Sequence, residues 1–245
     1  MKRKYEQQPK LKLYYFDIKG KGEPIRLLCA YAGIDIEDHR FVTRDEFLAM
    51  REGTRLPFSQ VPMLEVDGKH SLVQSCAIMR YLGKLGGLYP VDPIQAAKVD
   101  ALMEQETDTF IGTTVLTYGR RFGIDLTPDV KEKSYEQISD EVLPGHFRNI
   151  EKCLRASPTG WLAATDEPSP ADFMWYVKLS LMAEKKELSE KIRTLEDFPK
   201  LRAFMEKFES LTPIQEYYAS KDDHLEVPDS AAGKPWNATL PKTTI

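Results

Sequence analysis

The first fifty residues combine short apolar runs with helical patterns of apolar positions. Lys12 to Phe16 is an aromatic-rich run that predicts a strand, and the apolar spacing between Glu23 and Ala32 predicts a helix that ends at Gly33. His39 to Val42 predicts a second strand, and Arg44 to Arg51 predicts a short helix. The chain therefore opens with the order strand, helix, strand, helix.

A hairpin and a third helix are expected next. Met63 to Val66 and His70 to Val73 predict two antiparallel strands, because Asp67-Gly68 between them is a strong turn signal. Ser75 is predicted to be the N-cap of a helix that runs to Leu85. A parallel crossover followed by a hairpin is the order of a thioredoxin-like domain.

The same segment suits a small acidic ligand held by backbone groups. The Val61-Pro62 bond can be cis, and a proline at the start of a strand leaves the N–H and C=O of Val61 free for an extended, peptide-like ligand. The free N–H groups at a helix start near Ser75 would attract a carboxylate. The alternative is that Pro62 only shapes a turn and Ser75 only caps its own helix.

The chain after Pro90 is predicted to be helical up to a polar tail. Asp92-Pro93 is an acidic N-cap followed by proline, ahead of a long helix to Tyr118. Thr127-Pro128 begins another helix, in which Pro144-Gly145 is expected to cause a kink or a break before Arg155. Further helices are expected from a Ser169–Asp172 capping box to Glu187, from Phe198 to Leu211 and from Pro213 to Ala219.

These patterns predict an α+β protein in two domains. We expect a thioredoxin-like domain over residues 11–89 and an all-α helical bundle over residues 92–219. Residues 220–245 are expected to be a polar C-terminal tail with little to pack beyond Trp236.

Composition narrows the function. The chain has 245 residues, a net charge of −4 and no basic stripe with interleaved aromatics, which argues against nucleic acid as a partner. No apolar run approaches the roughly 20 residues that span a bilayer, so no membrane association is expected. Three widely spaced cysteines and four histidines form no metal-binding motif, so we expect reduced thiols, a cytoplasmic location and no metal.

Four segments carry a resemblance to a known family. They read YYFDIKGKGEPIRLL, LPFSQVPMLEVDG, QSCAIMRYL and SPADF, and in this order and spacing they resemble a cytosolic glutathione transferase, nearest to the sigma class. The resemblance covers roughly residues 11 to 218 and implies glutathione as cosubstrate, hydrophobic electrophiles as acceptors and a homodimer. The implied reaction is conjugation of the glutathione thiolate to the electrophile.

The resemblance also implies roles for individual residues. Tyr15 matches the catalytic tyrosine that donates a hydrogen bond to the sulfur, while Tyr14 must point to the opposite face of its strand. Without the resemblance, both tyrosines could equally be packing residues of a strand. The implied glutathione-binding residues are Tyr15, Lys21, Phe47, Arg51, Gln60, Val61, Pro62, Gln74, Ser75 and Asp108, the last reaching the neighbouring subunit's site.

Three residues depart from the family pattern. Phe47 stands where a tryptophan often bonds the glycyl carboxylate, and phenylalanine has no donor. Lys21 replaces an arginine and keeps the charge without the planar fork. Val115 replaces the tryptophan of prostaglandin D synthases of this class, which argues against that isomerase activity.

Two other functions remain open on the sequence. One is a glutathione-dependent isomerase or peroxidase, such as a prostaglandin synthase, and the other is a catalytically weak, crystallin-like binding protein. The acceptor pocket is expected to be apolar and aromatic. Its expected residues are Phe16 to Lys19, Phe110, Thr114, Tyr118, Tyr217 and Tyr218.

Overall fold

A four-stranded sheet forms the centre of the N-terminal half. The computed structural model describes residues 8–53 and 56–220. The strands, in the spatial order β2-β1-β3-β4, are β1 (Leu11–Phe16), β2 (Glu37–Phe41), β3 (Met63–Val66) and β4 (His70–Val73). β1 pairs with β2 in parallel, and the other two pairings are antiparallel, as expected for a crossover followed by a hairpin. The thioredoxin-like prediction is confirmed.

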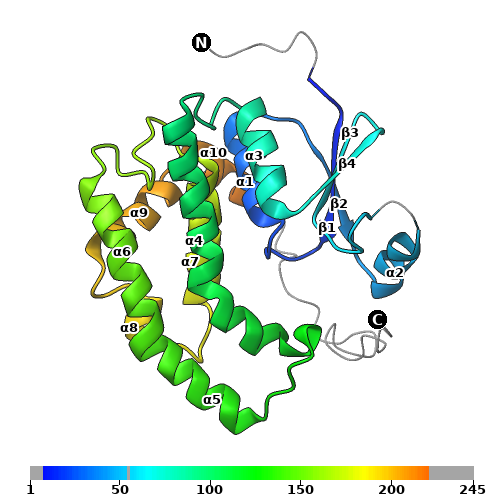
Figure 1. Cartoon of the computed structure of the whole chain (residues 1–245). Helices are drawn as coiled ribbons and strands as arrows, with labels where there is room; N and C mark the ends of the chain where they lie inside the picture. Colours follow the sequence, from blue (N-terminus) through cyan, green and yellow to red (C-terminus); the bar gives the residue numbers. More distant parts are fainter. Residues whose placement is uncertain (1–7, 54–55, 221–245) are drawn as a thin grey trace.

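Helices cover both faces of this sheet (Figure 1). On one face, α1 (Glu23–Ala32) and α3 (Ser75–Leu85) share a core with Tyr15 and the α-helical half of the chain. On the other face, α2 (Arg44–Glu52) packs Phe47 against a smaller cluster that contains Tyr14. The two adjacent tyrosines therefore lie on opposite faces, as the alternation of a strand requires.

The second strand and the cap of α3 differ from the sequence prediction, and β1 and α2 are each one residue longer than predicted. The second strand is Glu37–Phe41 rather than His39 to Val42, because Val42 has left the sheet and is 80% exposed. The N-cap of α3 is Gln74 rather than Ser75, and the Gln74 side chain makes no capping hydrogen bond. Ser75 is instead the first helical residue.

The helical half begins with the expected long helix. In α4 (Pro93–Tyr118) the Asp92 side chain accepts a hydrogen bond from the Gln95 N–H at 2.8 Å, so the predicted N-cap is confirmed. A short 3₁₀ turn at Gly119–Phe122 follows. Next come α5 (Pro128–Gln137), a π-helical turn (Ile138–Val142) and α6 (Leu143–Ala156). The interruption that Pro144 was expected to cause is this π-helical turn, which directly precedes the proline.

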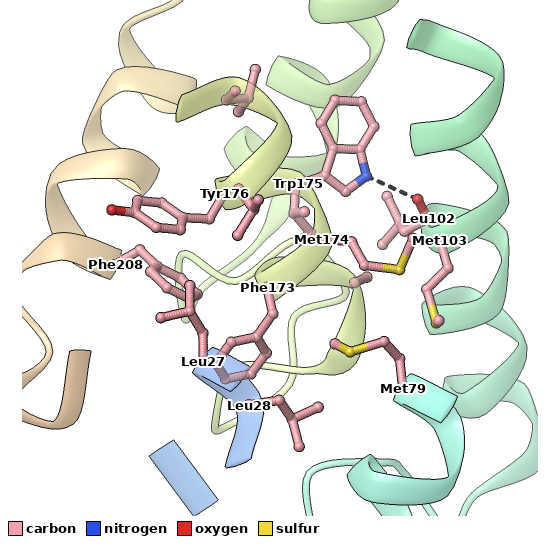
Figure 2. Packing of buried hydrophobic residues seen from close by; sticks show 14 of the residues in the cluster. Leu27, Leu28, Met79, Leu102, Met103, Phe173, Met174, Trp175, Tyr176 and Phe208 are labelled. Atoms are coloured by element: carbon pink, nitrogen blue, oxygen red, sulfur yellow. Dashed lines mark hydrogen bonds between the residues drawn. The ribbon is translucent and has the colours of Figure 1, made fainter. Parts of the chain in front are cut away.

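A buried helix, α7 (Pro170–Ala183), joins the two halves. Its capping box is confirmed, because the Asp172 carboxylate accepts hydrogen bonds from the Ser169 N–H at 2.8 Å and its hydroxyl at 2.7 Å. The Trp175 indole donates to the Leu102 carbonyl of α4 at 2.8 Å (Figure 2). The helix ends at Ala183, four residues before the predicted Glu187.

Three shorter helices complete the described chain. They are α8 (Glu190–Arg193), α9 (Pro199–Glu209) and α10 (Thr212–Ala219). α10 returns to the N-terminal half and packs against α1. The tail predicted for residues 220–245, with Trp236, lies outside the described residues except for Ser220. Within the described part, no helix is both long and apolar enough to cross a membrane.

Candidate active site

The strand register places three of the predicted site segments side by side. Tyr14 of β1 is the partner of Met63 of β3, and Met63 is the partner of Val73 of β4. Because these pairings are antiparallel, the next residues toward one end of the sheet are Tyr15, Pro62 and Gln74. These three residues therefore lie in a row. The β1 end, the residues before the hairpin and the start of α3 form one continuous surface.

The backbone along this row is suited to a peptide-like ligand. The Val61-Pro62 bond is cis, and the backbone N–H and C=O of Val61 form no hydrogen bond with any described residue. Gln74 has a φ of 71°, a left-handed conformation that is uncommon for a residue other than glycine and often marks a functional site. The N-cap side chain of α3 makes no capping hydrogen bond, so the first N–H groups of this helix, from Ser75 onward, can donate hydrogen bonds to an anion.

Tyr15 is buried beneath a glycine-containing turn. Its side chain is 6% exposed, and its hydroxyl accepts a hydrogen bond from the Lys21 N–H at 2.9 Å. A Cβ on Gly20 would lie 2.5 Å from the Tyr15 hydroxyl oxygen, and one on Gly22 would lie 2.4 Å from the ring. Only glycine permits the turn to lie this close to the ring.

The Tyr15 hydroxyl is available as a hydrogen-bond donor. Burial raises the pKa of Tyr15 above its ordinary value, although the Lys21 N–H acts in the opposite direction. The phenol therefore keeps its proton at neutral pH. Its oxygen already accepts from Lys21, and among the described residues no acceptor takes its hydrogen. A group placed beside Tyr15 can receive that hydrogen bond.

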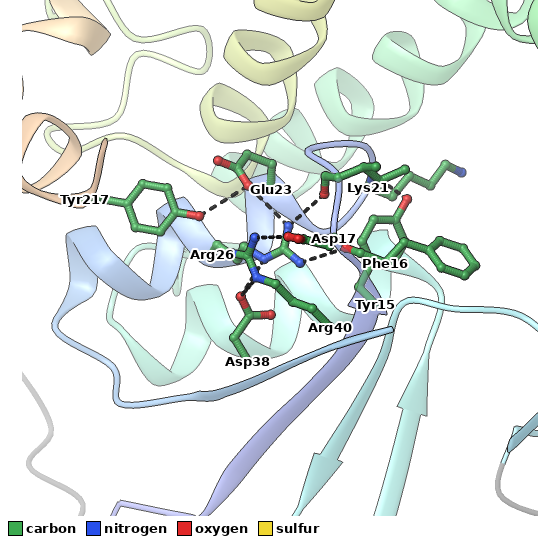
Figure 3. Close-up of polar contacts among 10 residues, drawn as sticks. Tyr15, Phe16, Asp17, Lys21, Glu23, Arg26, Asp38, Arg40 and Tyr217 are labelled. Atoms are coloured by element: carbon green, nitrogen blue, oxygen red, sulfur yellow. Dashed lines mark hydrogen bonds and ion pairs between the residues drawn. The ribbon is translucent and has the colours of Figure 1, made fainter. Parts of the chain in front are cut away.

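A buried ion-pair network fixes the turn that covers Tyr15 (Figure 3). Arg26 of α1, which is 3% exposed, donates to the carbonyls of Ile18 at 2.9 Å and Phe16 at 3.2 Å. The same guanidinium pairs with Glu23 at 3.2 Å and Asp38 at 2.9 Å. The sequence prediction missed Arg26, although an arginine within the apolar run of α1 was a usable signal.

Phe47, Arg51 and Gln60 are not part of this row. Phe47 packs its ring against Phe16 and Phe41, with centroid distances of 5.1 Å and 5.7 Å, so it serves the smaller core. Arg51 is half-buried at the end of α2, and Gln60 is exposed just before Val61. Their predicted contacts with a ligand stay predictions.

The predicted acceptor residues are divided between two places. Phe110, Thr114 and Tyr118 are spaced four residues apart on α4, so they share one side of that helix. Tyr217 of α10 instead donates a hydrogen bond to Glu23 at 3.2 Å, which ties it to α1. Burial raises the pKa of Tyr217 well above its ordinary range, so this hydroxyl stays protonated as the donor.

A separate cleft lies away from the predicted site residues. It has a volume of about 520 Å³ and lies where the ends of α1, α3 and α9 meet the start of α10. Tyr31 and Glu167, which form a short hydrogen bond, are among its lining residues. None of the predicted glutathione-binding residues lines this cleft.

Comparisons with known proteins identify the family. The model of the glutathione S-transferase N-terminal domain matches residues 11–84, and that of the C-terminal domain matches residues 124–221. The chain belongs to the glutathione S-transferase family and is a glutathione transferase.

Individual relatives cover nearly the whole chain. Mouse glutathione S-transferase A4 is 31% identical over 90% of this chain and 93% of its own length. Chicken hematopoietic prostaglandin D synthase is 32% identical over 84% and 94%, respectively. The solved structure of monomeric Na-GST-3, from the human hookworm Necator americanus, has a TM-score of 0.72, with 28% identity over 87% of this chain and 98% of that one.

Proposed function

We propose that this transferase conjugates the glutathione thiolate to hydrophobic electrophiles, with Tyr15 as the catalytic residue. The observation that carries the proposal is the buried Tyr15 hydroxyl, which accepts from Lys21 and still has its own hydrogen to donate. A hydrogen bond from this group to the sulfur stabilises the thiolate more than the thiol. The bound thiol then ionises at a lower pH than a free one.

The energy that this mechanism requires is modest. A free thiol has a pKa of about 8.5, and lowering it by about two units requires roughly 2.7 kcal/mol in favour of the anion. One charge-assisted hydrogen bond contributes about 1.5–3 kcal/mol. Tyr15 alone can therefore supply most of the shift.

The rest of the tripeptide fits the row beside Tyr15. We propose that Val61 pairs with the cysteinyl backbone and that Gln74 and Ser75 hold the γ-glutamyl carboxylate at the start of α3. Two observations support these assignments: the Val61 backbone has no hydrogen-bond partner among the described residues, and the N-cap side chain of α3 makes no capping hydrogen bond. Arg51 and Gln60 are proposed for the glycyl carboxylate, and Lys21 for the cation beside the sulfur.

A Tyr15→Phe variant tests the mechanism, with Tyr14→Phe as the matched control on the other face of the same strand. We expect Tyr15→Phe to lower conjugation of 1-chloro-2,4-dinitrobenzene by about 10²-fold or more, as for the loss of one preorganised donor. Ultraviolet titration of bound glutathione should show the thiol pKa rising toward that of the free thiol. A Tyr15→Phe variant with wild-type conjugation and an unchanged thiol pKa would rule out Tyr15.

An isomerase is the second candidate, because chicken hematopoietic prostaglandin D synthase is among the relatives. The same thiolate would then act on a different acceptor and leave it unconjugated. Product analysis by mass spectrometry separates the two functions, because only conjugation adds the mass of glutathione to the acceptor. Val115 on α4 continues to favour the transferase.

Class, location and assembly belong to the same proposal. We propose a cytoplasmic, sigma-like enzyme that forms a homodimer, with Asp108 reaching the γ-glutamyl amino group of the neighbouring site. Asp108 is exposed on α4, as such a contact requires. Analytical ultracentrifugation tests this assembly, and a monomer with full activity, like the monomeric state named for Na-GST-3, would refute the role of Asp108.

A further inference from the structure

A lysine interrupts the most deeply buried helix of the protein. α7 contains Phe173, Trp175 and Val177, which are all at most 3% exposed, and the next residue is Lys178. Its ammonium lies 5.4 Å from the centre of the Phe110 ring of α4. Lys178 itself is half-buried, and a charged side chain that is partly removed from water usually has a partner, because desolvation disfavours its charged form.

Lys178 differs from Lys19 and Lys185 in having no hydrogen-bond or ion-pair partner among the described residues. Lys19 forms an ion pair with Glu184 at 2.7 Å, and Lys185 donates to the Thr117 hydroxyl at 3.3 Å. No hydrogen bond or ion pair joins Lys178 to any residue in the described part of the chain. Its ammonium therefore has donors available to a ligand.

The charges around Lys178 favour an anion. The Glu106 carboxylate acts on Lys178 with negative charge, and Lys21 and Lys185 add positive charge. Burial lowers the pKa of Lys178, whereas Glu106 acts to raise it. Two further cations and one carboxylate thus act on Lys178, and this excess of positive charge attracts a negatively charged group.

Lys178 lies within reach of the proposed reaction centre. Lys21, whose N–H donates to the Tyr15 hydroxyl, is close enough to act on the charges of both Glu106 and Lys178. Tyr118 of α4 is close enough to Tyr15 to act electrostatically on its hydroxyl. Tyr118 lies eight residues after Phe110, which corresponds to about 12 Å along the helix. An elongated molecule lying along α4 would therefore extend from Tyr15 to Lys178.

We propose that Lys178 binds the carboxylate of the electrophilic acceptor, so that the preferred acceptors are apolar molecules that carry an electrophilic carbon at one end and a carboxylate at the other. This assignment rests on the proposed transferase function. With a conjugated enone as acceptor, the thiolate sulfur forms a bond to the β-carbon as the carbon–carbon π bond breaks. The resulting enolate takes a proton from water at the α-carbon, and the carboxylate is unchanged.

Ethacrynic acid and its primary amide provide a matched pair of probes, because they share the same enone and differ only in the remote charge. We expect the wild-type protein to show a kcat/KM about tenfold higher for the acid than for the amide, after correction for the uncatalysed rates. Lys178→Met, which keeps the apolar stem, should bring this ratio close to one. Lys178→Arg should retain the preference, and the exposed Lys152→Met should leave it at the wild-type value.

The outcomes separate this inference from the proposed function. Equal kcat/KM values for acid and amide in the wild-type protein, or an unchanged ratio in a folded Lys178→Met variant, would overturn the inference while conjugation itself is intact. A higher KM for glutathione in Lys178→Met, with the acid preference retained, would assign the lysine to glutathione and overturn it as well. Failure to conjugate either probe or 1-chloro-2,4-dinitrobenzene would instead refute the proposed function.

Discussion

Replacing Arg26 by methionine should strongly destabilise the protein, because this residue forms an ion pair with the fully buried Glu23. The substitution removes the 3.2 Å ion pair with Glu23 and two hydrogen bonds to the carbonyls of Ile18 and Phe16. Asp38 keeps its 2.7 Å pair with Arg40, so it adds little to the loss. Breaking a buried ion pair costs about 3–5 kcal/mol, and we expect about 4 kcal/mol here.

Urea denaturation of four proteins measures this effect as a double-mutant cycle. Glu23→Gln alone should cost less than Arg26→Met, because Arg26 then still pairs with Asp38. In the double variant no charge is left buried alone, so we expect a coupling free energy of about 2 kcal/mol between the two sites. A coupling below about 0.5 kcal/mol would show that the network does not act as a unit.

Two further predictions concern Tyr15 and a buried thiol. Gly22→Ala places a Cβ 2.4 Å from the Tyr15 ring and should lower kcat/KM for conjugation at least about tenfold by displacing it, whereas Gly53→Ala, with its nearest contact at 3.4 Å, should not. Burial raises the pKa of Cys29 to about 12. Above about pH 8.5 the unfolded thiol ionises while the folded one stays protonated, so unfolding free energy should fall by about 1.4 kcal/mol per pH unit until the folded pKa is reached. Cys29→Ala should remove this slope in chemical denaturation between pH 8.5 and 10, and an unchanged slope would contradict the burial argument.

Sequence reasoning succeeded where local chemistry decides the structure. The Asp67-Gly68 hairpin, the Asp92 N-cap and the Ser169–Asp172 capping box all depend on residues within three or four positions of one another. The opposite faces of Tyr14 and Tyr15 follow from strand alternation alone. Such features are fixed by geometry before the chain makes any long-range contact.

Sequence reasoning failed where segments that are distant in the sequence meet. Ser75 is a favourable N-cap residue, but the tight entry from β4 places Gln74 in that position with a φ of 71°. Phe47 packs against Phe16 and Phe41, a long-range contact that the local sequence does not reveal, and its predicted contact with glutathione stays a prediction. Lys178 was passed over, although a single lysine in the run FMWYVKLSLM is a visible anomaly.

The bond between Tyr217 and Glu23 has a consequence for synthesis of the protein. These residues are 194 positions apart in the sequence. The Tyr217 hydroxyl nevertheless helps to hold the Glu23 carboxylate against the Arg26 guanidinium, which secures the turn over Tyr15. We expect a nascent chain that still lacks α10 to have an imperfectly formed first domain, even though every strand of that domain has left the ribosome. Maturation of the amino-terminal region would then wait for translation to be almost finished, and stalled chains ending before α10 should be more sensitive to proteases there.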